Sequence, residues 1–347
     1  MKDGMQESIK DSMQDGMKDS IKDIIKDSIK QDNLQQDGWW AAALSESVSD
    51  KKPFAVTCDG VQLVLFRNAD GVALALEDRC PHRRVPLALG TVKPDGTLQC
   101  GYHGWTFDGA RGACKLIPNL RPDERIPQRY GARLPDRRRR RFRACLAGRR
   151  GTRRPPAWPG ILCRGGELTG SAILNIGHAE YQAVMLDGPE CLLGFDCVRI
   201  TDFFLGDARR DGDCLVFERG AVWKTQMLAP AFITDHPLIV RTTLALAGGS
   251  VKVELLSAEE APLVTVFIAA SANLRGTTGI CWRGFLHDAK VPGAPLRWRL
   301  ARAAGRAPFQ VFGEIDGAAI AALQVAPSRD LHAARAARGA PAAHAPT

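Results

Sequence analysis

Short apolar segments separated by turn residues are the main feature of the chain from residue 38 onwards. Between residues 54 and 107, the alternation of apolar and polar positions predicts five short strands, at 54–57, 61–67, 73–77, 97–100 and 106–107. Turn signals such as Asp108-Gly109 separate these strands. Strands of this length and spacing are typical of a small antiparallel barrel or sandwich, so we predict an all-β first part.

The part of the chain from residue 161 to residue 326 combines strand and helix patterns. Apolar runs predict strands at 198–205, 214–220, 222–228, 238–247, 251–257 and 263–270. Helical spacing predicts helices at 179–186, 295–304 and 315–323. Because strands outnumber helices, we predict an α+β domain with an antiparallel sheet.

Both ends of the chain have the composition of tails. Residues 1–37 repeat a four-residue unit, and on a helix of ~3.6 residues per turn the apolar position of each unit shifts by ~40°. The apolar stripe would therefore wind around such a helix, which favours a solvated, low-complexity tail over a docking element. Residues 327–347, rich in Ala, Arg and Pro, are predicted to be a disordered tail.

The distribution of apolar residues and cysteines indicates the cellular compartment in which we expect the protein. No apolar run reaches the ~18–20 residues that a membrane-spanning helix needs. The N-terminus alternates Lys with Asp instead of forming an apolar signal, so we expect a cytoplasmic protein without membrane contact. The ten cysteines are scattered along the chain, which favours free thiols or metal ligands over disulfides.

One arginine-rich block accounts for the net charge of +9. Residues 133–154 hold eleven arginines against the single acid Asp136, a local charge of +10, so the rest of the chain sums to −1. With the prolines that follow, the block forms a linker or altered segment at 133–160. Three interpretations stay open: a basic loop that docks an acidic ferredoxin or reductase, a nucleic-acid site, or a stretch altered by a shift of reading frame. Nucleic acid is the least favoured partner, because the block matches no recognisable binding module.

Two short segments each offer one thiol and one imidazole. Cys80 and His82 form a Cys-x-His pair, and Cys100 and His103 form a Cys-x-x-His pair after an interval of seventeen residues. Thiolates and imidazoles suit both zinc and iron–sulfur clusters. A tetrahedral zinc site and a [2Fe–2S] cluster are both compatible with these four residues on chemistry alone.

The residues around the four ligands resemble those of Rieske proteins. The two segments are Cys80-Pro81-His82-Arg83 and Cys100-Gly101-Tyr102-His103-Gly104-Trp105-Thr106-Phe107. This form is similar to that of Rieske non-haem iron oxygenases and their ferredoxins, over a domain that we place at 38–132. Residues 222–227 and 230–234 are loosely similar to the substrate-domain sheet of the demethylase-like members. The resemblance implies a [2Fe–2S] cluster held by Cys80, His82, Cys100 and His103. Tyr102 and Trp105 are interpreted as apolar cover for that cluster.

The same resemblance implies a second iron site in the domain at 161–326. Oxygenases of this family bind a mononuclear Fe(II) with two histidines and one carboxylate. In their sequences the two histidines lie in the motif Asp-x-x-His-x-x-x-x-His. That motif is absent, because no two histidines outside the cluster lie within six residues of each other. His178 and His236, with Asp187 or Glu190 as the carboxylate, are the weak candidates that could converge in space.

Two hypotheses about function follow from the resemblance. The first is the terminal oxygenase component of a Rieske-type oxygenase, which takes electrons from a ferredoxin or flavin reductase for O₂-dependent hydroxylation or demethylation of a small organic substrate, with aromatic compounds as one candidate class. Such components commonly form homotrimers. The second is an electron-transfer or non-catalytic Rieske protein with a degenerate oxygenase domain. About three irons per chain would distinguish the first from the second, which would hold about two.

Overall fold

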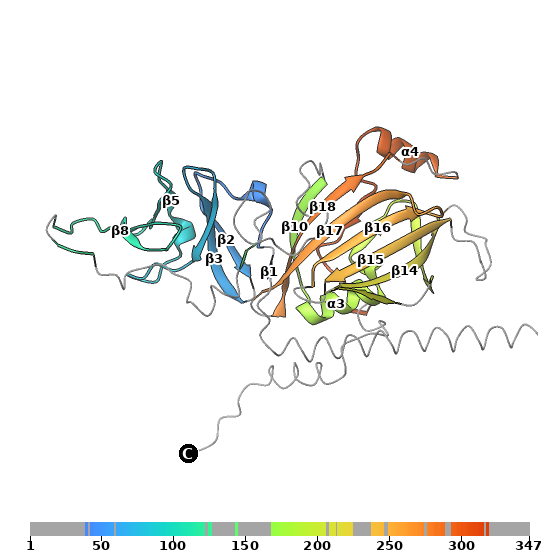
Figure 1. Cartoon of the computed structure of the whole chain (residues 1–347), viewed down its shortest axis with the longest axis horizontal. Helices are drawn as coiled ribbons and strands as arrows, with labels where there is room; N and C mark the ends of the chain where they lie inside the picture. The colour runs from blue at the N-terminus through green and yellow to red at the C-terminus, as the bar shows by residue number, and fades with distance from the viewer. Residues whose placement is uncertain are drawn as a thin grey trace, which may run out of the picture.

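The computed structural model describes two β-rich domains that follow one another along the chain (Figure 1). The described residues are 39–40, 42–58, 60–121, 124–126, 143–144, 168–205, 208–212, 214–224, 237–245, 249–273, 276–288, 293–315 and 317–318. The two predicted tails and most of the segment 133–160 lie outside these residues. Among the described residues, no helix has the length and apolar character required to cross a bilayer.

The first domain consists of two small antiparallel sheets, with strand orders β2-β3-β4 and β5-β6-β7-β8. Their strands are β2 (Phe54–Cys58), β3 (Val61–Arg67), β4 (Ala73–Glu77), β5 (Thr91–Val92), β6 (Leu98–Gln99), β7 (Thr106–Phe107) and β8 (Cys114–Leu116). Short 3₁₀ helices lie at η1 (Ser45–Ser47) and η2 (Leu87–Leu89). All five predicted strands are present, and the strand expected at 97–100 is shortened to β6. The all-β prediction is confirmed.

Strand β3 is the central element of the first domain and is buried on both faces. Val64 and Phe66 pack into one apolar cluster together with Phe107 of β7. Leu63 and Leu65 face the other way, into a second cluster. The cluster around Phe66 also contains the buried side chains of the two cysteines of the candidate site, so the domain core directly supports that site.

One strand pair connects the start of the first domain to the arginine-rich block. β1 (Trp39–Trp40) pairs in parallel with β9 (Arg143–Ala144), with Trp39 opposite Arg143. Arg143 and Ala144 are the part of the block that the structure describes.

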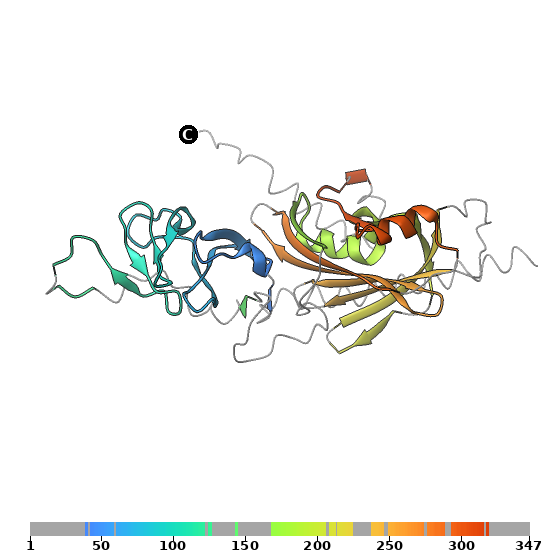
Figure 2. The same ribbon diagram turned by 90° about the horizontal axis from the view of Figure 1, so that it is seen from above.

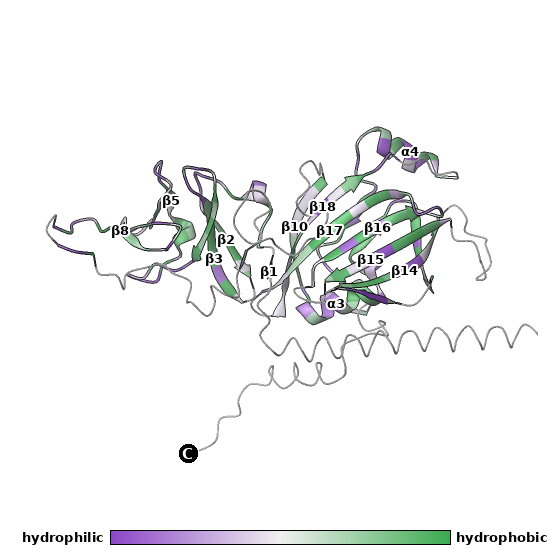
Figure 3. Ribbon diagram, in the orientation of Figure 1, coloured by the Kyte–Doolittle hydropathy of each residue, from purple (hydrophilic) through white to green (hydrophobic). Residues whose placement is uncertain are grey.

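The second domain is built on an eight-stranded antiparallel sheet of order β10-β18-β17-β16-β15-β14-β12, with β13 paired to β14. Its strands are β10 (Leu168–Leu174), β12 (Val198–Phe204), β13 (Arg209–Asp211), β14 (Cys214–Trp223), β15 (Leu238–Ala245), β16 (Val251–Ser257), β17 (Pro262–Ala272) and β18 (Thr278–Leu286). A separate pair joins β11 (Leu193–Phe195) to β19 (Phe309–Val311). Apolar positions follow the long strands (Figure 3). The predicted α+β domain with an antiparallel sheet is confirmed.

Two features of this sheet differ from the sequence prediction. The strands expected at 214–220 and 222–228 are one strand as far as Trp223, because Gly220 and Ala221 stay extended and pair with Ile239 and Leu238 of β15. Strands β10 and β18 were not predicted. Their sequences mix glycine and polar residues with apolar ones, and Gly170 of β10 packs directly against the ring of Trp282 in β18.

Two helices cover one face of the sheet (Figure 2). They are α3 (His178–Asp187) and α4 (Leu296–Ala303), with a short η3 (Pro189–Cys191) after α3. The helices predicted at 179–186 and 295–304 are thus confirmed, whereas the one expected at 315–323 lies mostly outside the described residues. Trp298 of α4 meets Trp223 of β14 edge to face, with ring centroids 5.4 Å apart, in the core between helices and sheet.

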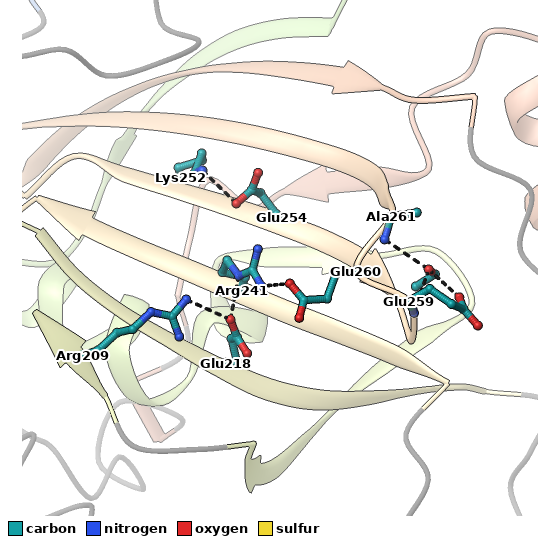
Figure 4. Close-up of polar contacts among 9 residues, drawn as sticks. Arg209, Glu218, Arg241, Lys252, Glu254, Glu259, Glu260 and Ala261 are labelled. Carbon is teal, nitrogen blue, oxygen red and sulfur yellow. Dashed lines mark hydrogen bonds and ion pairs between the residues drawn. The ribbon is translucent and has the colours of Figure 1, made fainter. Parts of the chain in front are cut away.

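A ladder of charged side chains crosses the opposite face of the sheet (Figure 4). Glu218 accepts from Arg241 at 2.7 Å and from Arg209 at 3.2 Å, and Arg241 also donates to Glu260 at 2.6 Å. Burial by itself would raise the pKa of Glu218, but the hydrogen bonds and charges of Arg241 and Arg209 outweigh it and hold the pKa below 4.5. The ionised carboxylate is therefore the form that the fold stabilises.

We expect Glu218→Gln to destabilise the protein in a pH-dependent way. Because the folded pKa lies below the unfolded value of 4.5, the ionised Glu218 contributes stability at higher pH that is lost as the pH falls through the folded pKa. The variant should lose about 1 kcal/mol near neutral pH, the scale of a partly exposed ion-pair network. Denaturant titrations across the acid range test this, and a loss that stays constant at acid pH would contradict it.

Candidate metal centre

The first cysteine–histidine pair lies on the loop between β4 and η2. The N–H of Cys80 donates to the carbonyl of Val85 at 2.9 Å, and the N–H of Arg84 donates to the carbonyl of Cys80 at 2.8 Å. Arg84 has a φ of 64°, the left-handed conformation that turns the chain back. The side chain of Cys80 is buried at the base of this loop, while that of His82 is exposed at its tip.

The second pair lies on the hairpin between β6 and β7. The N–H of Cys100 donates to the carbonyl of Trp105 at 2.8 Å, and the N–H of Gly104 donates to the carbonyl of Cys100 at 3.1 Å. Gly104 has a φ of 69°, which favours glycine at this position. Gly101 lies against the carbonyl of Leu89, which a Cβ would approach to 2.7 Å. Both glycines therefore permit the tight second loop.

The two loops bring all four candidate ligands together. The thiols of Cys80 and Cys100 lie within hydrogen-bonding reach of each other, and the rings of His82 and His103 have centroids 4.7 Å apart. Both cysteines are buried, whereas both histidines are exposed. The site is thus polarised, with its sulfur donors toward the domain core and its nitrogen donors toward solvent.

Local electrostatics affect the two kinds of donor differently. Burial raises the pKa of the Cys80 thiol to about 11, although the N–H groups of His82 and Arg83 oppose this by donating to the sulfur. Desolvation lowers the pKa of His82, and the neighbouring His103 and Arg83 lower it further. A lowered pKa keeps His82 in the neutral form that binds metals.

The arrangement fits a [2Fe–2S] cluster better than a single zinc ion. Among the described residues, no three His, Cys, Asp or Glu side chains come close enough to share one metal ion. A structural zinc site needs four donors around a single point. A Rieske cluster instead needs two thiolates at one iron and two imidazoles at the other. The structure pairs its candidate ligands in the same way, with Cys80 beside Cys100 and His82 beside His103.

An aromatic ring lies beside each histidine. Trp105 is stacked on His82, with ring centroids 4.7 Å apart and planes inclined by 6°. Tyr102 contacts His103, with centroids 3.9 Å apart and planes inclined by 34°. Trp105 is 9% exposed and matches its interpretation as apolar cover, but Tyr102 is 62% exposed and therefore shields little more than His103 itself.

His178 and Asp187, two of the weak candidates for a second iron, do not come together in the structure. His178 is the first residue of α3 and Asp187 is its last, so they are about 13 Å apart along the helix axis. Glu190 follows in η3 and is exposed. His236 lies outside the described residues.

Both helix-end residues have structural surroundings of their own. Asp187 lies 3.5 Å from the guanidinium of Arg219, a buried side chain of β14 that also donates to the carbonyl of Leu186 at 2.7 Å. His178 lies against Gly249, where a Cβ would come within 2.8 Å of its Nε2 atom. Burial lowers the pKa of His178 to about 4, so the ring is neutral at physiological pH.

A cavity of about 430 Å³ lies between the two domains. Its polar lining consists of hydroxyl and amide side chains together with Asp78 and Cys281. Asp78 accepts a hydrogen bond from the N–H of Ala88 at 2.7 Å, so its carboxyl group supports the turn that precedes β5. No histidine lines this cavity, which therefore adds no candidate for a second metal site among the described residues.

Comparison with known proteins places the first domain in a family. Residues 38–131 match the Rieske [2Fe-2S] domain. This chain is 46% identical over 94 residues to the putative toluene-4-sulfonate monooxygenase system iron-sulfur subunit TsaM2 of Comamonas testosteroni (27% of this chain, 25% of the relative). It is 45% identical over 84 residues to the oxygenase component of dicamba O-demethylase of Stenotrophomonas maltophilia (24% of each chain). The chain thus spans about a quarter of each of these two relatives.

Solved structures resemble both domains together. Dicamba monooxygenase bound to 3,6 dichlorosalicylic acid has a TM-score of 0.55 and 18% identity, with 89% of this chain and 92% of that chain covered. The apo form of dicamba monooxygenase has a TM-score of 0.53 and 19% identity, covering 88% and 90%. At this identity the likeness establishes a shared fold, in which a further domain follows the first.

Proposed function

We propose that this chain, whose residues 38–131 are a Rieske [2Fe-2S] domain, is the terminal oxygenase component of a Rieske-type oxygenase. It would take electrons from a ferredoxin or flavin reductase for O₂-dependent hydroxylation or demethylation of a small organic, aromatic substrate. The observation that carries the proposal is the meeting of two thiols and two imidazoles from two tight loops. The two-domain fold and the oxygenase relatives support it.

The cysteines and the histidines of the two loops would have different roles at the proposed centre. Cys80 and Cys100 would bind the inner iron, and His82 and His103 the outer one. The N–H groups of His82 and Arg83 that donate to the Cys80 sulfur favour its thiolate form. When bound, the cluster would store one electron at a time and pass it on. The exposed imidazole edges leave the nitrogen side open to a donor protein.

The described residues of the second domain do not fit a mononuclear Fe(II) site. His178 and Asp187 lie at opposite ends of α3, and Asp187 faces Arg219. This observation favours a second candidate function, an electron-transfer or non-catalytic Rieske protein with a degenerate oxygenase domain. The first candidate requires ligands from the remaining residues, among them His236.

Metal analysis of the full chain after anaerobic reconstitution separates the two candidates. We expect about three irons and two sulfides per chain, together with a visible spectrum and a paramagnetic signal after one-electron reduction, if the chain is an oxygenase component. About two irons, with no O₂ consumption during reduction, would establish the electron-transfer role instead. A colourless protein with neither iron nor signal would contradict both.

The proposed assembly is a homotrimer, the arrangement that the family resemblance implies. A chain of 37.7 kDa would then give a particle of three times this mass. Light scattering of the reconstituted protein measures it directly.

A further inference from the structure

The two aromatic neighbours of the histidines differ in how firmly they are held. Trp105 is nearly buried and belongs to the apolar cluster that contains Val64, Phe66 and Phe107. Tyr102 is mostly exposed and contacts His103 from the solvent side. Only one of the two rings is therefore fixed by the domain core.

Trp105 connects three parts of the centre. Its carbonyl accepts the hydrogen bond from the N–H of Cys100, so its backbone closes the second loop. Its ring lies flat on His82, which belongs to the first loop. The side chain that packs in the core thus reaches across from one loop to the histidine of the other.

His82 depends on this contact for its orientation. Metal-binding histidines usually have their ring plane fixed by a hydrogen bond from the second ring nitrogen to a carboxylate or carbonyl. In the described part of the chain neither ring nitrogen of His82 has such a partner, and its other ring contact is the exposed His103. The nearly parallel stack on a buried indole is what remains to hold the plane.

We propose that Trp105 is a positioning residue that fixes the ring plane of His82, and hence the direction of its metal-binding nitrogen. The proposal rests on the proposed [2Fe–2S] centre. Tyr102 has no such role, because its exposed ring can move together with His103. The two histidines are thereby unequal: one is held rigidly from the core, while the other is free to adjust.

The test compares three variants of the reconstituted full-length protein. Trp105→Leu keeps an apolar side chain but removes the ring face, Trp105→Phe keeps a smaller ring face, and Tyr102→Leu is the matched control. After reduction with dithionite, pulsed paramagnetic resonance measures the nitrogen couplings of the two histidines. We expect broadened or shifted couplings for one histidine in Trp105→Leu, and iron loss to a chelator about tenfold faster. Trp105→Phe and Tyr102→Leu should remain close to the wild type.

The remaining outcomes also decide the question. Wild-type couplings in Trp105→Leu, or equal changes in Trp105→Leu and Tyr102→Leu, would overturn the positioning role. If Trp105→Leu fails to fold by circular dichroism, Trp105→Met, a longer apolar side chain without a ring face, takes its place: broadened or shifted couplings of one histidine support the role, and wild-type couplings overturn it. A wild-type protein that binds no cluster contradicts the proposed function, which is a separate failure.

Discussion

We expect Cys100→Ala to abolish the visible absorption and the bound iron of the reconstituted protein. The buried thiols of Cys80 and Cys100 form the core side of the centre, and among the described residues no third His, Cys, Asp or Glu side chain joins them in a group that could hold one metal ion. Water cannot replace a thiolate at this position, because the side chain that it would replace is only 2% exposed. Iron and sulfide analysis after anaerobic reconstitution measures the loss, which we expect to be complete.

Cys114→Ala is the matched control for this experiment. Cys114 lies in the same domain, on β8, and its thiol contacts the carbonyl of Leu116 instead of the centre. This variant should bind the same amount of iron as the wild type. Full iron content in Cys100→Ala, or a parallel loss in Cys114→Ala, would show that the assignment of the ligands is wrong.

Asp187→Ala is expected to destabilise the second domain strongly without changing the iron content. Arg219 is 2% exposed, and the carboxylate of Asp187 lies 3.5 Å from its guanidinium. Removing one partner of a buried ion pair takes a counter-charge from the other partner, at a cost of about 3 kcal/mol. Chemical denaturation measures the change in stability, and metal analysis of the same samples tests whether Asp187 is an iron ligand.

The double variant Asp187→Ala with Arg219→Met provides the control. Because it removes both charges, it should recover part of the stability that Asp187→Ala loses. A loss of about one iron per chain in Asp187→Ala, with an unchanged free energy of unfolding, would show instead that Asp187 is an iron ligand.

The sequence predicted most of the sheets because their strands are bounded by local signals. Strands β3, β4, β7 and β16 begin and end at the predicted residues, where turns or charged residues follow apolar runs. The split of β14 at Gly220 was wrong because pairing with β15 on one side holds a glycine extended, and that partner is remote in the sequence. Strand β18 lies between β10 and β17, and its mixed sequence gives no local sign of this.

Some features of the candidate centre could be predicted from the sequence, and others could not. The grouping of Cys80 with His82 and of Cys100 with His103 could be predicted because each pair lies on a single short loop, where spacing in the sequence determines spacing in the fold. That these four residues bind a cluster stays a prediction. The stack of Trp105 on His82 joins residues of two different loops, so no local sequence pattern predicts it. The separation of His178 from Asp187, by contrast, followed from the predicted helix itself, since these residues flank it at either end.

The parallel pairing of Trp39–Trp40 with Arg143–Ala144 means that the polypeptide enters and leaves the cluster-binding module side by side. A module with neighbouring entry and exit points behaves as a cassette, because it can be transplanted between host proteins with short connectors.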